Sequence, residues 1–103
     1  MEAAKEKHVE EIINHVAGRN AGHIMLYALS TCVWCARTKK LLDELGVAYD
    51  FEYVDHLQGD AREKAIEKVK VWNPSCSFPT MVINNKTCVV GFKEDEIRGV
   101  LRP

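Results

Sequence analysis

The feature that most constrains the fold is a pair of cysteines, Cys32 and Cys35, at the point where an apolar run gives way to a helical pattern. Residues 24–29 are apolar without alternation, which is typical of a strand buried on both faces of a parallel sheet. Residues 33–45 then carry apolar side chains at helical spacing, and Gly46 predicts the end of that helix. The first folding unit is therefore strand, turn and helix, with the cysteine pair in the turn.

Further elements follow in an order that defines the fold class. Residues 47–54 alternate apolar and polar side chains and predict a second strand, which a right-handed crossover makes parallel to the first. Residues 60–72 predict a helix. Residues 80–83 and 87–90 flank an asparagine-rich turn and predict two antiparallel strands, before a short helix from residue 94. This order predicts an α/β domain in which a four-stranded mixed sheet is flanked by helices.

The N-terminal segment adds one element to this core. Four of its apolar residues recur at helical spacing: Val9, Ile12, Ile13 and Val16. This spacing predicts an extra helix over residues 2–17, which Gly18 ends. The 103 residues suffice for one compact unit. We therefore divide the chain into an N-terminal helical extension, residues 1–22, and the main domain, residues 23–103.

Charge and hydropathy exclude several classes of partner. The chain has 14 lysines and arginines against 15 aspartates and glutamates, a formal net charge of −1, without a long run of one sign. Nucleic acid is therefore not expected as the main partner. No apolar stretch reaches the roughly 20 residues that a bilayer requires, and residues 1–20 lack the apolar region of a signal peptide. We expect a cytoplasmic protein that does not contact membranes.

The position of each cysteine predicts its chemistry. Cys32 falls at the first turn of the helix, where unpaired N–H groups and the helix dipole stabilise a thiolate, so it is the candidate nucleophile. Cys35 shares the inward face of Leu42 and is the candidate resolving thiol. Together they predict exchange with a substrate disulfide, without a bound cofactor. A zinc site would need a second closely spaced pair, which Cys76 and Cys88 do not form, so we predict no metal site.

A proline at the start of the third strand is the second signal. Pro79 cannot donate a hydrogen bond to the sheet, and proline at this position often marks a sheet edge or a cis peptide. A cis Phe78–Pro79 bond would leave the backbone of Phe78 free to pair with a bound peptide or thiol. Cys76 lies nearby and is either buried or an oxidation-sensitive thiol. Trp34, beside the nucleophile, either contacts a partner or packs against the proline loop.

These motifs together resemble the glutaredoxin branch of the thioredoxin fold over residues 23–102. The resemblance rests on strand–Cys32-Val33-Trp34-Cys35–helix, on Phe78-Pro79-Thr80 and on the Gly91-Phe92 turn. It implies a thiol-disulfide oxidoreductase of cellular redox homeostasis that reduces protein disulfides or mixed disulfides. Cys32 would be its nucleophile and Cys35 its resolving thiol, with a cis Pro79 facing both. The substrate-binding candidates are Thr31, Trp34, Phe78, Pro79, Gly91, Phe92 and Asp95.

Departures from the family pattern leave the electron donor open. Val33 and Trp34 replace the common Pro and Tyr, Leu29 stands where lysine is frequent, and Phe92 replaces the second glycine of a Gly-Gly turn. The last two changes weaken the prediction of a glutathione site. The turn from Gly91 to Asp95 instead resembles redoxins that serve ribonucleotide reductase and draw electrons from thioredoxin reductase.

The resemblance thus leaves glutathione and thioredoxin reductase as alternative electron donors. It implies a monomer without tightly bound cofactors. Another alternative is a module that binds or delivers a [2Fe-2S] cluster through Cys32, with external glutathione as a further ligand.

Overall fold

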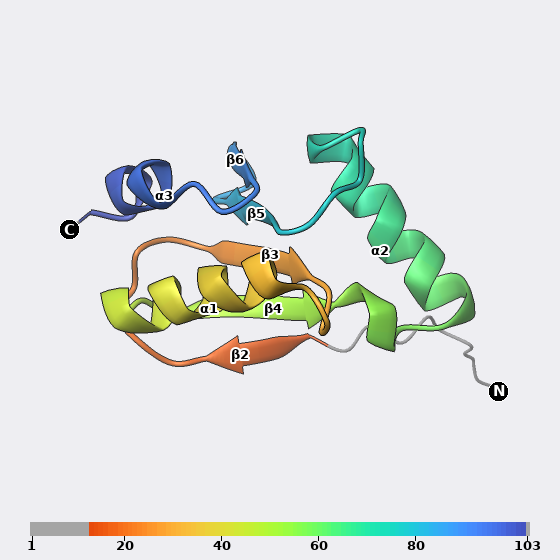
Figure 1. Ribbon diagram of the computed structural model, residues 1–103, viewed down its shortest axis with the longest axis horizontal. Coiled ribbons are helices and arrows are strands. Elements are labelled where there is room, and N and C mark those ends of the chain that lie inside the picture. Colours follow the sequence, from red (N-terminus) through yellow and green to blue (C-terminus); the bar gives the residue numbers. More distant parts are fainter. Residues whose placement is uncertain (1–12, 103) are drawn as a thin grey trace, which may run out of the picture.

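The computed structural model describes residues 13–102 of the chain. Its centre is a five-stranded sheet in the order β2-β4-β3-β5-β6, and α1 lies along β3 and β4 (Figure 1). Strand β3 is parallel to β4, and every other neighbouring pair is antiparallel. The elements are β2 Asn14–Val16, β3 Ile24–Ala28, α1 Val33–Leu45, β4 Tyr49–Tyr53, the 3-10 helix η1 Val54–His56, α2 Gly59–Trp72, β5 Thr80–Ile83, β6 Thr87–Val90 and α3 Glu94–Val100.

The central strand β3 separates two apolar cores. All five of its residues are buried, and successive side chains point to opposite faces of the sheet. Leu26 packs in one core with residues of α1 and α3, whereas Met25 packs in the other core with residues of α2. The uninterrupted apolar run in the sequence is therefore explained by helices on both faces, and the predicted α/β class with a mixed sheet is confirmed.

The N-terminal helix predicted over residues 2–17 is wrong where the structure describes it. Asn14–Val16 forms β2, which pairs antiparallel with β4, so the sheet has five strands rather than four. Residues 1–12 of that prediction lie outside the described residues. The physical reason is non-local: β2 satisfies the backbone groups that β4 would otherwise leave unpaired at the sheet edge, and Val16 packs on the core below.

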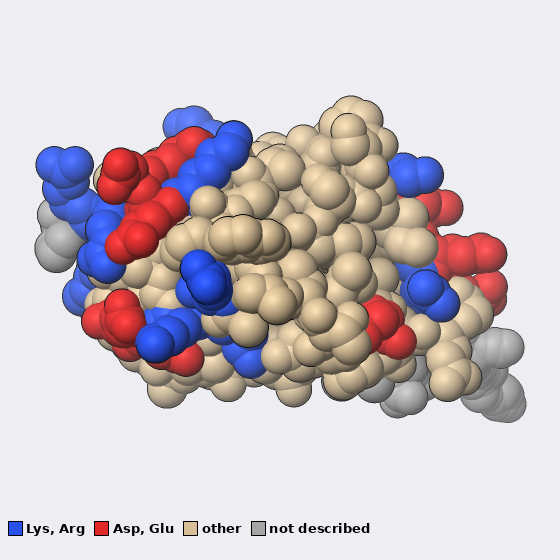
Figure 2. All heavy atoms as spheres, viewed as in Figure 1, with Lys and Arg blue, Asp and Glu red and all other residues tan. Residues whose placement is uncertain are grey.

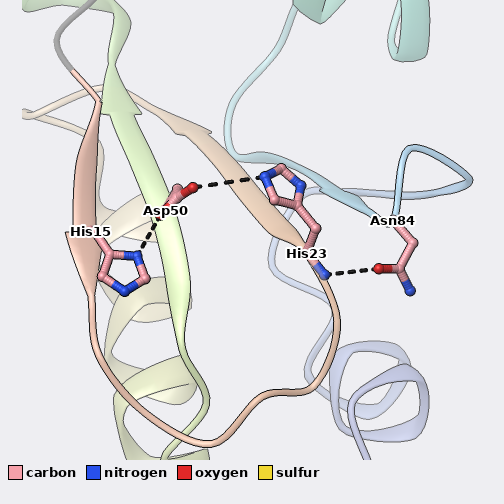
Figure 3. Close-up of polar contacts among 4 residues, drawn as sticks. All are labelled: His15, His23, Asp50 and Asn84. Carbon is pink, nitrogen blue, oxygen red and sulfur yellow. Dashed lines mark hydrogen bonds and ion pairs between the residues drawn. The ribbon is translucent and has the colours of Figure 1, made fainter.

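Side-chain contacts reinforce this correction. His15 on β2 and His23, just before β3, both face the carboxylate of Asp50 on β4 (Figure 3). His15 Nδ1 lies 2.6 Å and His23 Nε2 lies 3.7 Å from its oxygens. The His23 backbone N–H also donates to Asn84 Oδ1 at 2.8 Å. Three strands and the β5–β6 turn are thus linked across positions distant in sequence.

The segment between β2 and β3 also joins the main domain directly. Arg19 donates its backbone N–H to Gly46 O at 2.7 Å and accepts from Ala48 N at 2.8 Å. At Gly18 a Cβ atom would lie 2.6 Å from the carbonyl carbon of Val47, so only glycine permits this approach. The described part of the predicted extension is therefore an integral edge of the sheet.

The surface carries charges of both signs. Figure 2 shows acidic and basic side chains intermixed toward both ends of one face, with few charges between them. Within residues 13–102, no helix combines the length and the apolar character needed to cross a membrane.

Candidate active site

Cys32 occupies the N-cap of α1, the position where the helix exposes unpaired N–H groups. Its backbone is extended, with φ −92° and ψ 118°, and its Sγ accepts a hydrogen bond from the backbone N–H of Cys35 at 3.2 Å. Serine, threonine or aspartate usually supplies this acceptor, so the thiol takes the place of a capping oxygen. The half-buried Cys32 therefore lies at the end of the helix toward which the unpaired N–H groups point.

Cys35 lies one turn into α1 and is buried, with 1% of its surface exposed. Its Sγ accepts a hydrogen bond from Leu29 N at 3.5 Å. Burial, and after it the hydrogen bond with Cys32, raises the pKa of the Cys35 thiol to about 12. The geometry therefore gives the pair the asymmetry that the sequence predicted, with one accessible sulfur at the helix start and one shielded sulfur behind it.

The proline loop faces this pair. The Phe78–Pro79 peptide bond is cis, as predicted. The Phe78 carbonyl oxygen lies 4.0 Å from Cys32 Sγ, and Pro79 O accepts from Gly91 N at 2.8 Å. Two loops distant in sequence therefore meet beside the candidate nucleophile.

A small apolar groove of about 230 Å³ opens at this meeting point. Its lining residues are Trp34, Phe78, Pro79, Gly91 and Phe92. The rings of Trp34 and Phe92 stack with centroids 6.0 Å apart, and the Arg37 guanidinium lies 4.9 Å from the Trp34 ring centre. Five of the seven predicted substrate-binding residues are thus brought together, with a cation over the indole ring.

The two remaining candidates do not line the groove. Thr31 is exposed in the loop directly before Cys32, and Asp95 is exposed in the first turn of α3. Trp34 is 53% exposed while stacking on Phe92, so it offers a large aromatic surface beside the dithiol. Cys76, which the sequence analysis considered for burial, is only half-buried, and so is Cys88.

Sequence reasoning missed Asn73, which it treated only as the end of a helix. The Asn73 side chain is buried, and its Nδ2 lies 3.0 Å from Ser77 Oγ and 3.1 Å from both Ser77 O and Thr80 Oγ1. Thr80 Oγ1 donates to Ser77 O at 2.7 Å. Asn73 therefore anchors the loop that leads to Phe78. An Asn-Pro pair signals a turn, but nothing in the sequence reveals these partners.

Sequence reasoning also missed Asp55, in η1. Its Oδ1 accepts from Ser30 N at 2.9 Å, and its Oδ2 accepts from the Ser30 hydroxyl. Ser30 belongs to the loop between β3 and α1, so this carboxylate contacts the segment that leads to the nucleophile. A lone aspartate after a strand is too common a pattern to predict this role.

No group of three or more His, Cys, Asp or Glu side chains in the described part of the chain is arranged to hold a metal ion. The cluster-binding alternative uses Cys32 with an external thiol, and it stays a prediction.

Comparison with known proteins agrees with this geometry. A family model described as glutaredoxin matches residues 24–88, which include both cysteines and the proline loop. The chain belongs to the glutaredoxin family. Its α/β architecture is accordingly the thioredoxin-like fold.

Two solved structures are similar to this chain over most of their length. A glutaredoxin from Methanosarcina mazei Go1 is 52% identical and superposes with a TM-score of 0.83. The match covers 91% of this chain and 90% of that glutaredoxin. Methanoredoxin from Methanosarcina acetivorans is 48% identical over 84% of this chain and 90% of its own, with a TM-score of 0.81. Glutaredoxin 1 of Rickettsia conorii is 40% identical over 45 residues, which span 44% of this chain and 44% of that protein. Family membership supports a thiol redox function in general.

Proposed function

We propose that this protein reduces protein disulfides or mixed disulfides by dithiol exchange through Cys32 and Cys35. The observation that carries the proposal is the placement of Cys32 Sγ at the start of α1, 3.2 Å from Cys35 N and 4.0 Å from Phe78 O, beside the groove. One sulfur is accessible to a substrate, and its partner lies one helical turn away. Membership of the glutaredoxin family supports the same reaction class.

The first step is attack of the Cys32 thiolate on one sulfur of the substrate disulfide. A new S–S bond joins Cys32 to that sulfur, and the other substrate sulfur leaves as a thiolate. Cys35 then loses its proton to solvent and attacks Cys32 Sγ. The Cys32–Cys35 disulfide forms, the second substrate thiolate leaves, and two electrons have passed from protein to substrate. An external thiol donor returns the pair to the dithiol form.

Substrate recognition falls to the groove and the proline loop. Extended substrate backbone next to the disulfide pairs with the backbone of Phe78, and an adjacent apolar side chain packs in the groove against the stacked rings of Trp34 and Phe92. Thr31 and Asp95 lie outside the groove lining and contribute only to the rim. The donor reaches the same sulfur, because Cys32 is the more exposed of the two active-site thiols.

Coupled turnover of a model disulfide tests this function. Glutathione with glutathione reductase is run in parallel with thioredoxin reductase, and NADPH consumption is followed in each. Turnover with at least one donor, abolished in Cys32→Ser and retained in Cys88→Ser, is the expected result. Activity that survives in Cys32→Ser contradicts the proposal. The productive donor decides between the two alternatives that the residues near the groove leave open.

We also propose that the protein acts as a cytoplasmic monomer without a tightly bound cofactor. A dithiol that acts as a reductant is maintained in reducing compartments, and one chain supplies both the dithiol and the groove. Size-exclusion chromatography with light scattering tests the oligomeric state, and a dimer at micromolar concentration would contradict it.

A further inference from the structure

The loop that precedes the nucleophile is held from two sides by hydrogen bonds to successive backbone amides. Leu29 N donates to Cys35 Sγ at 3.5 Å, and Ser30 N donates to Asp55 Oδ1 at 2.9 Å. Cys32 N closes the turn by donating to Leu29 O at 3.2 Å. One short segment therefore connects the resolving thiol, the nucleophile and the carboxylate of Asp55.

Asp55 makes two contacts with this segment, because its second oxygen accepts from the Ser30 hydroxyl. Both contacts fix a single residue, two positions before Cys32. Asp55 itself belongs to η1, directly after β4, so it ties the loop to the parallel neighbour of β3. Asp55 therefore fixes this segment at Ser30, in addition to the contact of Leu29 with the thiol of Cys35.

The carboxylate is also an electrostatic neighbour of the dithiol. Burial is the main cause of the raised pKa of Cys35, but the negative charge of Asp55 acts in the same direction. Burial opposes ionisation of Asp55 itself, yet the hydrogen bonds from Ser30, a backbone hydrogen bond and the nearby His56 together lower the pKa of Asp55. Asp55 is therefore charged at neutral pH and opposes the formation of a second negative charge on Cys35.

We propose that Asp55 is a positioning residue of the dithiol, which holds the nucleophile loop through Ser30 and places a negative charge near the resolving thiol that the adjacent Leu29 contacts. This inference rests on the proposed function for its effect on turnover, but not for its effect on Cys35. In the second step of exchange, Cys35 must release a proton before its sulfur attacks Cys32. The charge of Asp55 thus disfavours the Cys35 thiolate both before and after the mixed disulfide has formed.

Two substitutions separate the two roles. Asn in Asp55→Asn can accept from Ser30 N through Oδ1 and donate to Ser30 Oγ through Nδ2, so it keeps both contacts and removes only the charge. Alanine in Asp55→Ala removes both the charge and the contacts. Asp60→Asn makes the same charge change at an exposed position in the first turn of α2 and is the matched control.

The charge is tested by alkylation of Cys35 with iodoacetamide at pH 9. The measurement is made in a Cys32→Ser background and resolved by site with mass spectrometry. We expect Asp55→Asn to raise the alkylation rate about two- to fivefold, because more Cys35 is thiolate, while solvent around the exposed Asp55 screens its charge and keeps the effect modest. Asp60→Asn should leave the rate unchanged. Equal rates in Asp55→Asn and Asp60→Asn would overturn the electrostatic role.

The positioning role is tested with a chromogenic aryl disulfide on the protein with both active-site cysteines. Attack by Cys32 releases one coloured thiolate and resolution by Cys35 releases a second, so the two steps are seen as successive bursts. We expect the second burst of Asp55→Asn to be as fast as in the parent or faster, and that of Asp55→Ala to be at least threefold slower. Equal second-burst rates in these two variants would overturn the positioning role. Absence of both bursts in the parent would instead refute the proposed function. The Cys35 alkylation rates of Asp55→Asn and Asp60→Asn would still test the electrostatic role of Asp55.

Discussion

Replacement of Asn73 by alanine should destabilise the fold and impair disulfide reduction together. The Asn73 side chain is only 6% exposed, and its amide faces three oxygen acceptors from Ser77 and Thr80 at 3.0–3.1 Å. An amide carries two hydrogens and can satisfy two strong bonds at a time. At about 1 kcal/mol for each net hydrogen bond, Asn73→Ala should lower the free energy of unfolding by about 2 kcal/mol.

For a domain of this size, that loss corresponds to a decrease in melting temperature of about 8–16 °C. Chemical denaturation of the reduced protein, followed by circular dichroism, measures the free energy directly. Ser75→Ala is the matched control, because Ser75 is exposed in the same loop. Asn73→Asp keeps the shape but replaces the donor with an acceptor, so it should destabilise the fold at least as much.

The same substitution should affect catalysis through the proline loop. Loss of the Asn73 contacts frees the chain that presents Phe78 O to Cys32 Sγ, so kcat/KM for a protein disulfide should fall. Alkylation of Cys32 should change little, because its sulfur is stabilised by Cys35 N within α1. If Asn73→Ala unfolds like Ser75→Ala and retains full activity, the anchoring role of Asn73 is refuted.

Two further predictions concern the dithiol and the groove. Trp34→Ala should lower kcat/KM for protein disulfides about tenfold, because it removes one wall of the groove, and should change the thermal stability little. Val33 is also exposed but does not line the groove, so Val33→Ala should change neither quantity much. Because the pKa of Cys35 is raised from 9.0 to about 12, the unfolded chain ionises first as pH rises, so the free energy of unfolding of the reduced protein should decrease between these values. The decrease should be smaller in Cys35→Ala. Denaturation at a series of pH values measures the free energy of unfolding of both proteins. The same dependence on pH in both would contradict the raised pKa of Cys35.

Local patterns in the sequence were sufficient to predict most of the fold. The strands at residues 80–83 and 87–90 have the predicted bounds, because the turn between them contains Asn84 and Asn85, which adopt positive φ angles of 56° and 50°. The N-cap position of Cys32 and the inward direction of Cys35 also follow from local geometry, since strand, turn and helix are adjacent in the chain.

What the sequence could not predict depends on contacts between distant segments. Residues 14–16 have no strand pattern of their own, and they form β2 because β4 offers an unpaired edge. Asn73 and Asp55 are ordinary polar residues until folding places Ser77 and Ser30 within reach of their side chains. Asp95 was assigned to the site through the family resemblance, yet the groove wall near it is formed by Gly91 and Phe92.

The central claim is that Cys32 attacks the substrate and Cys35 resolves the intermediate. Mass spectrometry of Cys35→Ser after incubation with a model disulfide tests this claim most directly, with Cys32→Ser as its counterpart. The account predicts one stable mixed disulfide in Cys35→Ser, mapped to Cys32, and no adduct at position 35 in Cys32→Ser. An adduct on Cys35 in Cys32→Ser, or none on Cys32 in Cys35→Ser, would contradict the assignment of the two thiols.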